Sequence, residues 1–273
     1  MLYRSGYSIA EIVSRDSPAS RRRALLLANK VGARAVTARD STLRADLLWL
    51  CVPDREIHAA ASSLVKRDLG KLKYAFHSSG ALPAAELRPL KRRGISIASV
   101  HPLMTFVPGV KPSLDGVPFV VQGDSSAVRV ARSIVRRLQG IVFPLTSPRK
   151  AAYHTWATMT SPLLLAFFVT LEGVARIAGF GKDDARRMSL PIIRQTIANY
   201  AELGPKRSFS GPIIRGDVAT VAKHLAVLRN DPVARAAYIA LVHAALRNLP
   251  VGNREELSRL LLRTQGAKSR SAK

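Results

Sequence analysis

The sequence predicts an α/β domain with a mostly parallel sheet, followed by an all-helical domain. From residue 9 to about residue 145, short apolar segments alternate with longer segments of helical periodicity. This alternation is typical of strand–helix–strand units joined by right-handed crossovers. From about Lys150 onwards, helical segments follow one another without strands. The expected domains are 1–148 and 149–263, and the basic tail at 264–273 is expected to be disordered.

Seven segments of the first domain are predicted as strands. In chain order they are 9–13, 33–37, 45–52, 73–77, 95–100, 117–122 and 141–145. The third contains the run LLWLCV, which is apolar throughout. This is typical of a strand buried on both faces, so Cys51 within it is expected to be a small core residue.

Four helices are predicted between these strands, at 17–33, 55–69, 84–94 and 125–140. Pro18 suits a first helical turn and Gly32 suits a helix end. Asp54 directly precedes the second of these helices and is expected to cap it.

The second domain is predicted to contain helices at 150–178, 183–203, 218–230, 231–249 and 254–263. Pro162 is expected to bend the first of them. The stretch PLLLAFFVTL is too short for a membrane span, and we expect it to be buried in the domain core or in a dimer contact.

The chain is strongly basic, with a formal net charge of +25 and a pI near 11.4. Such a charge favours polyanionic partners, and nucleic-acid binding is one alternative function. However, the basic residues form short clusters along the whole chain, which is more typical of a solvated surface. The single cysteine excludes a disulfide framework, and no secretory signal is visible, so we expect a cytoplasmic protein without membrane association.

Four loops at the carboxyl ends of predicted strands are candidate ligand contacts. They are VSRD at 13–16, VPD at 52–54, HSSGA at 77–81 and HPLMTF at 101–106. In open α/β sheets, ligands bind outside the carboxyl ends of the strands.

Three motifs resemble one protein family. HPLMTF at 101–106, KAAYH at 150–154 and SGPIIRGDVATVAKHL at 210–225 resemble motifs of Rossmann-like proteins with a helical C-terminal domain of unknown function. These are relatives of pyrroline-5-carboxylate reductase and the β-hydroxyacid dehydrogenases. The resemblance implies an NADP-dependent oxidoreductase acting on a small-molecule substrate, and a homodimer built through the helical domain. It leaves a deazaflavin open as the cofactor in place of a nicotinamide.

The resemblance assigns cofactor contacts to three loops. Ser14 and Arg15 end the strand that approaches the cofactor ribose, where an arginine accommodates the 2′-phosphate of NADP. The other expected contacts are Val52, Pro53 and Asp54, followed by Ser78, Ser79 and Gly80 near the nicotinamide end.

One expected motif is missing from the chain. Rossmann-like domains open with a strand and a G-x-G-x-x-G turn that binds the pyrophosphate, and no such turn occurs in these 273 residues. Two explanations remain open: a start codon assigned too late, or a non-catalytic dimeric scaffold that has lost cofactor binding. Either way, we expect the chain as given to bind NADPH poorly.

The candidate catalytic residues are Lys150, His154 and Ser161, because offsets of four and eleven bring them onto one helical face. Lys150 or His154 would transfer the proton that accompanies hydride transfer, and Ser161 would hold the substrate. The candidate substrate contacts are His101, Arg215, Asp217 and His224, with Arg215 suited to an anionic group. Asp217 is also expected to cap the helix that follows it. We expect no metal site.

Overall fold

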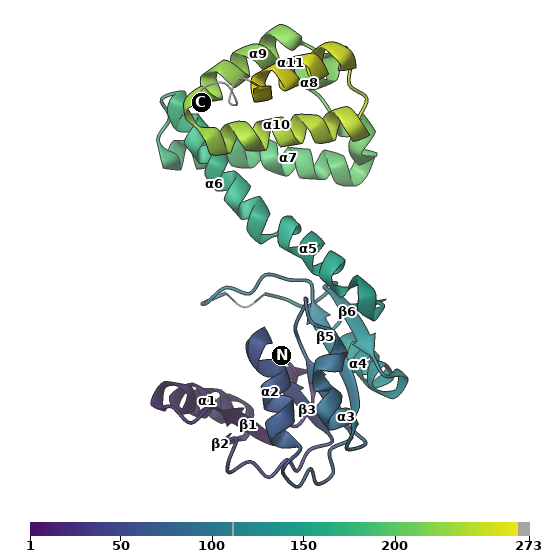
Figure 1. Cartoon of the computed structure of the whole chain (residues 1–273). Coiled ribbons are helices and arrows are strands. Elements are labelled where there is room, and N and C mark those ends of the chain that lie inside the picture. Colours follow the sequence, from purple (N-terminus) through teal and green to yellow (C-terminus); the bar gives the residue numbers. More distant parts are fainter. Residues whose placement is uncertain (111, 267–273) are drawn as a thin grey trace, which may run out of the picture. The chain divides into compact units, whose positions relative to one another are not determined.

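The computed structural model of the chain describes residues 1–110 and 112–266. It divides into two compact units, Met1–Ser161 and Pro162–Lys273 (Figure 1). This division lies after the change of pattern at 148–149, because the first helix of the helical region packs with the first unit. Lys150 and Tyr153 of that helix are both buried.

Each strand predicted from the sequence is present in the first unit. The strands are β1 (Glu11–Ser14), β2 (Arg34–Thr37), β3 (Leu47–Leu50), β4 (Tyr74–His77), β5 (Ser96–Pro102), β6 (Pro118–Gly123) and β7 (Ile141–Pro144). They form two sheets, β1-β2 and β3-β4-β5-β6-β7. All pairs are parallel except β5 with β6, which is antiparallel.

Helices cover both faces of the larger sheet. The helices of this unit are α1 (Pro18–Val31), α2 (Asp54–Leu64), α3 (Arg88–Lys91), α4 (Ser125–Arg137) and α5 (Lys150–Thr160). On one face Ala75 and Ile97 share an apolar cluster with α2 and α3, and on the other Phe76 and Ala98 share a cluster with α4. Adjacent strand residues thus point to opposite faces, as a pleated strand requires.

Several local predictions are wrong. The helix expected at 84–94 is a 3₁₀ turn, Ala84–Leu87, followed by the four residues of α3. Asp54 does not cap α2, because its carboxylate instead accepts a hydrogen bond from the Ser79 hydroxyl. The run LLWLCV is not buried on both faces: in β3 only Leu50 is buried, and Cys51 is exposed. β3 pairs with β4 on one side only, which leaves its apolar residues partly uncovered.

The second unit is helical. Its helices are α6 (Pro162–Ile177), α7 (Lys182–Ser208), α8 (Pro212–Arg215), α9 (Val218–Val227), α10 (Pro232–Asn248) and α11 (Arg254–Gly266). Its core includes Val221 and Leu225 of α9, Val242 of α10 and Leu257 of α11. The cap at Asp217 is confirmed, since its side chain accepts a hydrogen bond from the backbone N–H of Thr220. The tail expected to be disordered begins inside α11, and 267–273 lie outside the described residues.

One stretch of the described chain, Ser147–Ile177, is long and apolar enough to cross a membrane by length and composition, with a mean hydropathy of 1.5. None of its most apolar window is buried. The helix expected at 150–178 is interrupted at Pro162, because α5 ends at Ser161 in a non-helical conformation and Pro162 begins α6. The apolar residues here, among them Leu163, Leu165 and Val169, are exposed in the single chain and so are not buried in the domain core, whereas their burial in a dimer contact stays a prediction.

Candidate functional site

A buried lysine lies at the carboxyl edge of β4 and β5. Lys150, in the first turn of α5, is only 2% exposed. Its ammonium donates hydrogen bonds to the Ser99 hydroxyl at 2.8 Å and to the Ser79 carbonyl oxygen at 3.0 Å. Lysines are almost never fully buried unless they are paired, so this arrangement marks a specific role for Lys150.

The lysine belongs to a wider polar network. The Ser99 hydroxyl donates to the Ser79 carbonyl oxygen at 3.1 Å, and the Ser79 hydroxyl donates to Asp54 at 2.6 Å. The backbone N–H of Ser79 donates to Nδ1 of the fully buried His77. The network therefore joins the ends of β3, β4 and β5, and it rigidifies the loop that carries Ser79.

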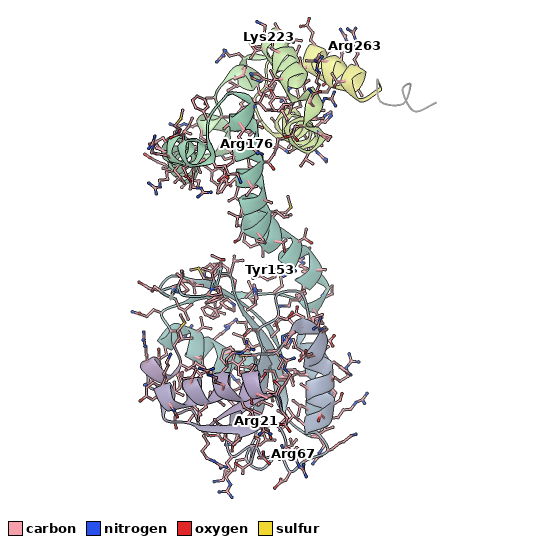
Figure 2. The ribbon with its side chains drawn as sticks, turned by 90° about the vertical axis from the view of Figure 1, so that its left-hand side faces the viewer. Arg21, Arg67, Tyr153, Arg176, Lys223 and Arg263 are labelled. Atoms are coloured by element: carbon pink, nitrogen blue, oxygen red, sulfur yellow. The ribbon has the colours of Figure 1, made fainter. Side chains whose placement is uncertain are left out.

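His101 and Tyr153 of this unit contact each other beside the loop that carries Ser79 and Gly80. The Tyr153 hydroxyl lies 2.7 Å from Nδ1 of His101, and Tyr153 lies on α5 one turn after Lys150 (Figure 2). The Lys150 ammonium lies 5.8 Å from the centroid of the Tyr153 ring. His101 and His154 both lie against Gly80: a Cβ atom at Gly80 would be 2.8 Å from His101 Nε2 and 2.7 Å from His154 Cδ2. Only a glycine allows this approach.

Burial shifts the pKa values of these groups. Desolvation lowers the pKa of Lys150 to about 8, against an opposing effect of the Asp54 charge. Desolvation, together with the charges of Lys150 and His154, lowers the pKa of His101 to about 4. Desolvation also raises the pKa of Tyr153 to about 12. At neutral pH, His101 and Tyr153 are therefore both uncharged, and the pair holds a transferable proton.

The structure brings together some of the predicted catalytic residues. Lys150 lies at the centre of the polar network, and His154 contacts the Gly80 loop. Ser161 is exposed and lies where α5 ends ahead of Pro162, so its role in holding the substrate stays a prediction. Sequence reasoning missed Tyr153 and Ser99. The signal for Tyr153 was its position three residues after Lys150 within KAAYH, which places both on one side of the helix.

The expected 2′-phosphate contacts lie at the end of β1. A cleft of about 410 Å³ is lined by Ser14, Arg21, Arg22, Thr37 and Asp40, among others. Arg15 is exposed beside it and lies 3.5 Å from Glu56. Arg15 after β1 and Arg21 and Arg22 near the start of α1 suit an anionic group, and Arg15 and Arg21 also pair with the carboxylates of Glu56 and Asp16.

The next predicted contacts follow β3 and β4. Val52 is half-buried, Pro53 precedes the first residue of α2, and Asp54 and Ser79 belong to the polar network. The Ser78 hydroxyl accepts a hydrogen bond from the Trp49 indole at 2.8 Å. Gly80, in the loop expected near the nicotinamide end, is buried between His101 and His154, and its lack of a Cβ leaves room for both rings.

These residues contain no motif of the kind that usually binds the pyrophosphate of a dinucleotide. The motif that binds it is a glycine turn between a strand and a helix. In the described part of the chain, no strand pairs with both β1 and β3. The single G-x-G there, at Gly179–Gly181, belongs to the second unit. The residues present therefore fit a dinucleotide at its two ends and not at its centre.

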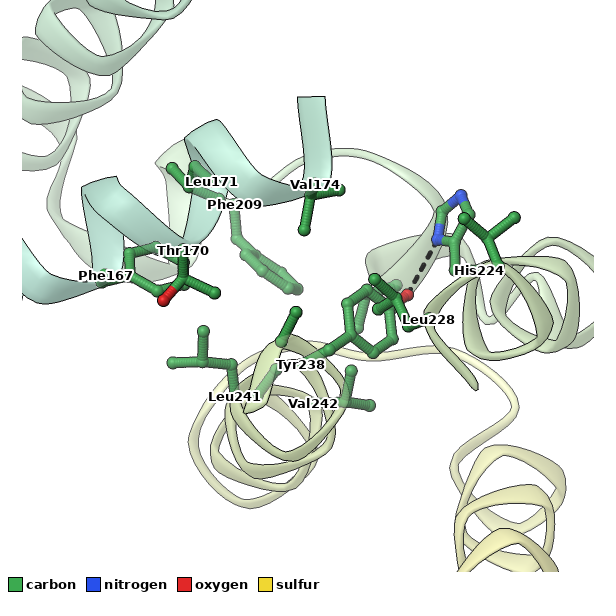
Figure 3. A pocket seen from close by; sticks show the side chains of 14 residues that line it. Phe167, Thr170, Leu171, Val174, Phe209, His224, Leu228, Tyr238, Leu241 and Val242 are labelled. Carbon is green, nitrogen blue, oxygen red and sulfur yellow. Dashed lines mark hydrogen bonds between the residues drawn. The ribbon is translucent and has the colours of Figure 1, made fainter. Parts of the chain in front are cut away.

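The remaining predicted substrate contacts lie in the second unit. A largely apolar cavity of about 470 Å³ is lined by residues of several helices, including Phe167, Leu171 and Leu241, and by Phe209, which follows α7 (Figure 3). His224 lines it and lies 2.9 Å from the Tyr238 hydroxyl.

Two of these predicted contacts lie apart from the cavity. Arg215 and Asp217 are not among its lining residues, and the Asp217 carboxylate accepts hydrogen bonds from Thr220. Among residues 1–110 and 112–266, no group of three His, Cys, Asp or Glu side chains is placed to hold a metal ion.

Two family models match the sequence. Residues 1–102 match a Rossmann-like domain, and residues 117–245 match a domain of unknown function, DUF2520. The predicted resemblance is thereby confirmed for both domains. No functionally curated protein matches the sequence significantly.

Several solved structures share the fold over most of the chain. A protein from Thermotoga maritima matches with a TM-score of 0.71 at 23% identity, over 94% of each chain. A protein from Bacteroides fragilis that is described as an NADP oxidoreductase matches with a TM-score of 0.69 at 22% identity, over 89% of this chain and 90% of that chain. An imine reductase from Myxococcus stipitatus in complex with NADP⁺ matches with a TM-score of 0.61 at 16% identity, over 95% of this chain and 93% of that chain. At these identities the likeness establishes the fold.

Proposed function

Because the chain combines a Rossmann-like domain with a DUF2520 domain, we propose that it is an NADP-dependent oxidoreductase. It would transfer a hydride to or from a substrate carbon bonded to nitrogen or oxygen. One observation carries the proposal: a buried lysine supports an uncharged His101–Tyr153 pair at the carboxyl edge of β4 and β5. This edge is where open α/β sheets bind their ligands. The named oxidoreductases of the same fold support the same class.

The His101–Tyr153 pair supplies the proton. With the Tyr153 hydroxyl donating to Nδ1, the His101 proton is on Nε2, the atom that faces Gly80. Nε2–H donates to the nitrogen or oxygen of the substrate as negative charge develops there, and Tyr153 passes its proton to Nδ1. The charge of the Lys150 ammonium beside the Tyr153 ring then favours the phenolate, against the desolvation that raises the pKa of Tyr153.

Lys150 is thus a positioning residue. At 2% exposure its ammonium does not reach a substrate, and its hydrogen bonds go to Ser79 and Ser99. It acts through Tyr153 and through the loop of Ser79 and Gly80. This differs from the direct acid–base role predicted from the sequence, and the physical reason is burial.

Two versions of the protein test the function. One is the 273-residue chain, and the other is an extended version with roughly 20 residues fused ahead of residue 1, forming an apolar strand, a G-x-G-x-x-G turn and most of a helix. The measurement is NADPH oxidation with panels of small cyclic imines, ketones and aldehydes. We expect turnover with at least one panel in the extended version. If the extended version binds NADPH and oxidises it with no substrate of any panel, the proposed reaction class is wrong.

Arg15 is proposed to select NADP over NAD. In the extended version, Arg15→Asp should weaken NADPH binding by roughly ten- to a hundred-fold, the loss of one charge-assisted contact, and leave NADH binding unchanged. Calorimetry with both cofactors measures the change. Arg23→Asp is the matched control, since Arg23 is an exposed arginine of α1 that bonds the Ala19 carbonyl and does not line the cleft. Equal effects of the two variants would show that only the overall charge matters.

We also propose that the protein is a cytoplasmic homodimer. The two helices α6 and α7 pack together, and we take as the apolar face their exposed apolar residues Leu163, Leu165, Val169, Met188, Ile192, Ile197 and Tyr200. Charged residues lie beside this face, including Glu172, which bonds Arg186. Flanking ion pairs suit a protein interface better than a bilayer, and an isologous contact would cover the same face on both copies.

The double variant Leu165→Asp and Ile192→Asp should turn this dimer into a monomer in analytical ultracentrifugation. Val233→Asp is the matched control, because Val233 is equally exposed but lies on α10. The control should remain a dimer. A wild-type protein that is monomeric at tens of micromolar, or one that sediments with lipid vesicles, would contradict the proposal.

A further inference from the structure

One buried imidazole bonds both ends of the loop that carries Ser79 and Gly80. His77 is the last residue of β4 and is fully buried. Its Nδ1 lies 3.1 Å from the backbone nitrogen of Ser79, and its Nε2 lies 3.1 Å from the carbonyl oxygen of Pro83. Residues 78–83 lie in neither a helix nor a strand, so their buried backbone groups need other partners, and the His77 ring supplies two.

The partners of His77 fix which ring nitrogen carries the proton. A backbone N–H only donates, so Nδ1, which faces Ser79, is unprotonated. A carbonyl oxygen only accepts, so Nε2 carries the proton and donates it to Pro83. Desolvation lowers the pKa of His77 to about 4, with the Lys150 charge acting in the same direction. The Pro83 hydrogen bond and the Asp54 charge act against it. The ring is therefore neutral at neutral pH, with its proton on Nε2.

The residues between these two hydrogen bonds meet the candidate site. The Ser79 carbonyl oxygen accepts a hydrogen bond from the Lys150 ammonium at 3.0 Å. Gly80 comes next in the chain and is buried between His101 and His154. The peptide bond that joins Ser79 to Gly80 thus contacts the site, and His77 holds the peptide bond directly before it. A rotation of the first would move the acceptor of the lysine.

The two ends of the loop are held differently. Beside Pro83, the backbone N–H of Ala84 donates to the Gln122 side chain at 2.7 Å, so this end has a second tether. At the other end, the direction of the Ser79 N–H is set by Nδ1 of His77. Loss of the Nδ1 contact should therefore displace the loop more than loss of the Nε2 contact.

We propose that His77 is a positioning residue, whose neutral ring holds the Ser79 peptide in the orientation that places the Lys150 ammonium. The part that concerns the reaction rests on the proposed function. The part that concerns the loop stands on the contacts of the 273-residue chain alone.

Nitrogen NMR of the 273-residue chain at neutral pH tests the state of the ring, because protonated and unprotonated ring nitrogens differ in chemical shift. The His77 signals are identified by their loss in His77→Asn. We expect them to show an unprotonated Nδ1 and a protonated Nε2. A protonated Nδ1, a charged ring or a mixture of the two tautomers would overturn the proposal.

Two variants of His77 each preserve one of its hydrogen bonds. His77→Asn places an amide oxygen near the position of Nδ1 and preserves the acceptor for Ser79. His77→Gln places an amide N–H near the position of Nε2 and preserves the donor to Pro83. Each loses one hydrogen bond, so urea unfolding should show similar losses of stability. Hydrogen exchange of the Ser79 amide should stay near the wild-type rate in His77→Asn and rise by roughly ten-fold or more in His77→Gln.

The same two variants test the reaction in the extended version. The kcat should fall by roughly ten-fold or more in His77→Gln and by much less in His77→Asn. Because the two lose similar stability, this difference reports on the loop and not on general weakening. Equal losses of kcat, or fast Ser79 exchange in His77→Asn, would overturn the proposal. If the extended version turns over no substrate, the proposed function fails, and the NMR and exchange measurements decide the role of His77 in the loop.

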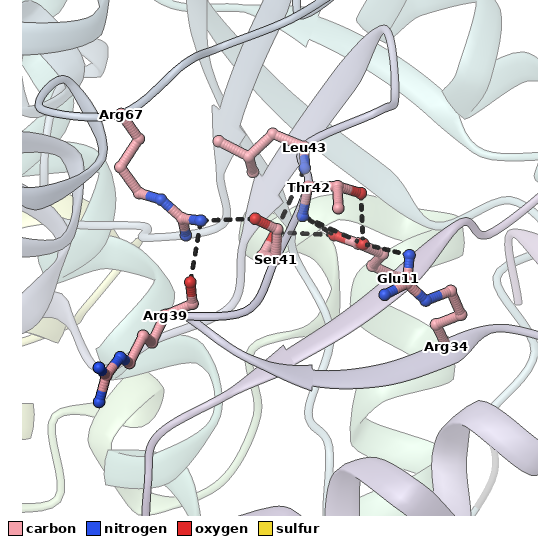
Figure 4. A network of polar contacts seen from close by, with 7 residues as sticks. All are labelled: Glu11, Arg34, Arg39, Ser41, Thr42, Leu43 and Arg67. Atoms are coloured by element: carbon pink, nitrogen blue, oxygen red, sulfur yellow. Dashed lines mark hydrogen bonds and ion pairs between the residues drawn. The ribbon is translucent and has the colours of Figure 1, made fainter.

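The loop that leads into β3 provides the matched control. The Thr42 hydroxyl donates to the Glu11 carboxylate at 2.7 Å, which ties that loop to β1 (Figure 4). Thr42→Val removes this one hydrogen bond and leaves the loop after β4 unaltered, so Ser79 exchange and kcat should stay at wild-type values. Faster Ser79 exchange in Thr42→Val would show that any loosening of the unit opens the loop, and would overturn the specific role of His77.

Discussion

Replacing Tyr153 with phenylalanine is expected to lower the turnover of the extended protein by roughly 10²- to 10⁴-fold, the range contributed by a positioned proton donor. The variant removes one hydroxyl, the group 2.7 Å from His101 Nδ1, and preserves the ring that packs at the site. Without the hydroxyl, the proton that His101 gives up is not replaced. Steady-state kinetics measure the loss, which should fall on kcat while NADPH affinity stays near that of the wild type.

Tyr200→Phe is the matched control, because Tyr200 is an exposed tyrosine of α7. It should turn over as the wild type does. A His101→Phe variant should lose as much as Tyr153→Phe, and the double variant should lose little more, because residues that act as a unit are not additive. Independent, additive losses would show that the two side chains do not form one proton path.

Lys150→Met is expected to lower turnover by roughly a hundred-fold or more. The variant removes the charge beside the Tyr153 ring and the hydrogen bonds to Ser79 and Ser99, while the methionine fills most of the space. The pH profile of kcat should lose the ionisation near pH 8 that Lys150 contributes. Lys73→Met provides the control, since Lys73 is an exposed lysine paired with Asp46.

The same lysine should also make stability depend on pH. The pKa of Lys150 is lowered to about 8 in the fold from its ordinary value of 10.5, so between these pH values the unfolded chain binds a proton that the folded chain does not. Stability relative to Lys150→Met should therefore rise as pH increases from about 8 to about 10.5. The limit is about 3 kcal/mol for a shift of this size.

Urea unfolding of both proteins across this pH range measures the difference. A stability difference between wild type and Lys150→Met that is constant with pH would show that the lysine is solvated, and would remove the basis of its positioning role. The comparison needs no cofactor and no substrate, so it remains informative whatever reaction the protein catalyses.

The organisation of the fold could be predicted from local pattern. Alternating apolar segments indicated each strand of the first unit, and helical periodicity indicated the helical second unit, because side-chain spacing reports directly on period. Asp217 was also recognisable as a helix cap from local pattern, because the residue it contacts, Thr220, lies only three residues later in the chain. The prediction of one helix at 84–94 was wrong, because the same apolar spacing occurs in a short 3₁₀ turn followed by one turn of helix.

The site could be predicted only in part. The loops at strand ends followed from the topology rule for α/β sheets, and Lys150 and His154 followed from spacing within one helix. Ser99 and the His101–Tyr153 pair did not, because they come from β5 and α5, whose residues are 51 or 52 apart in the chain. No local pattern encodes contacts of that range.

By itself, the amino-acid sequence determined the order of strands and helices, the family of both domains and the absence of a G-x-G-x-x-G turn from these residues. Only the tertiary structure decided which polar groups are buried and which strands pair. Burial lowers the pKa of Lys150, whose ammonium lies beside the Tyr153 ring, since desolvation depends on what surrounds a charge. Pairing places β1 and β3 in separate sheets, since LLWLCV is as apolar in an edge strand as in a central one.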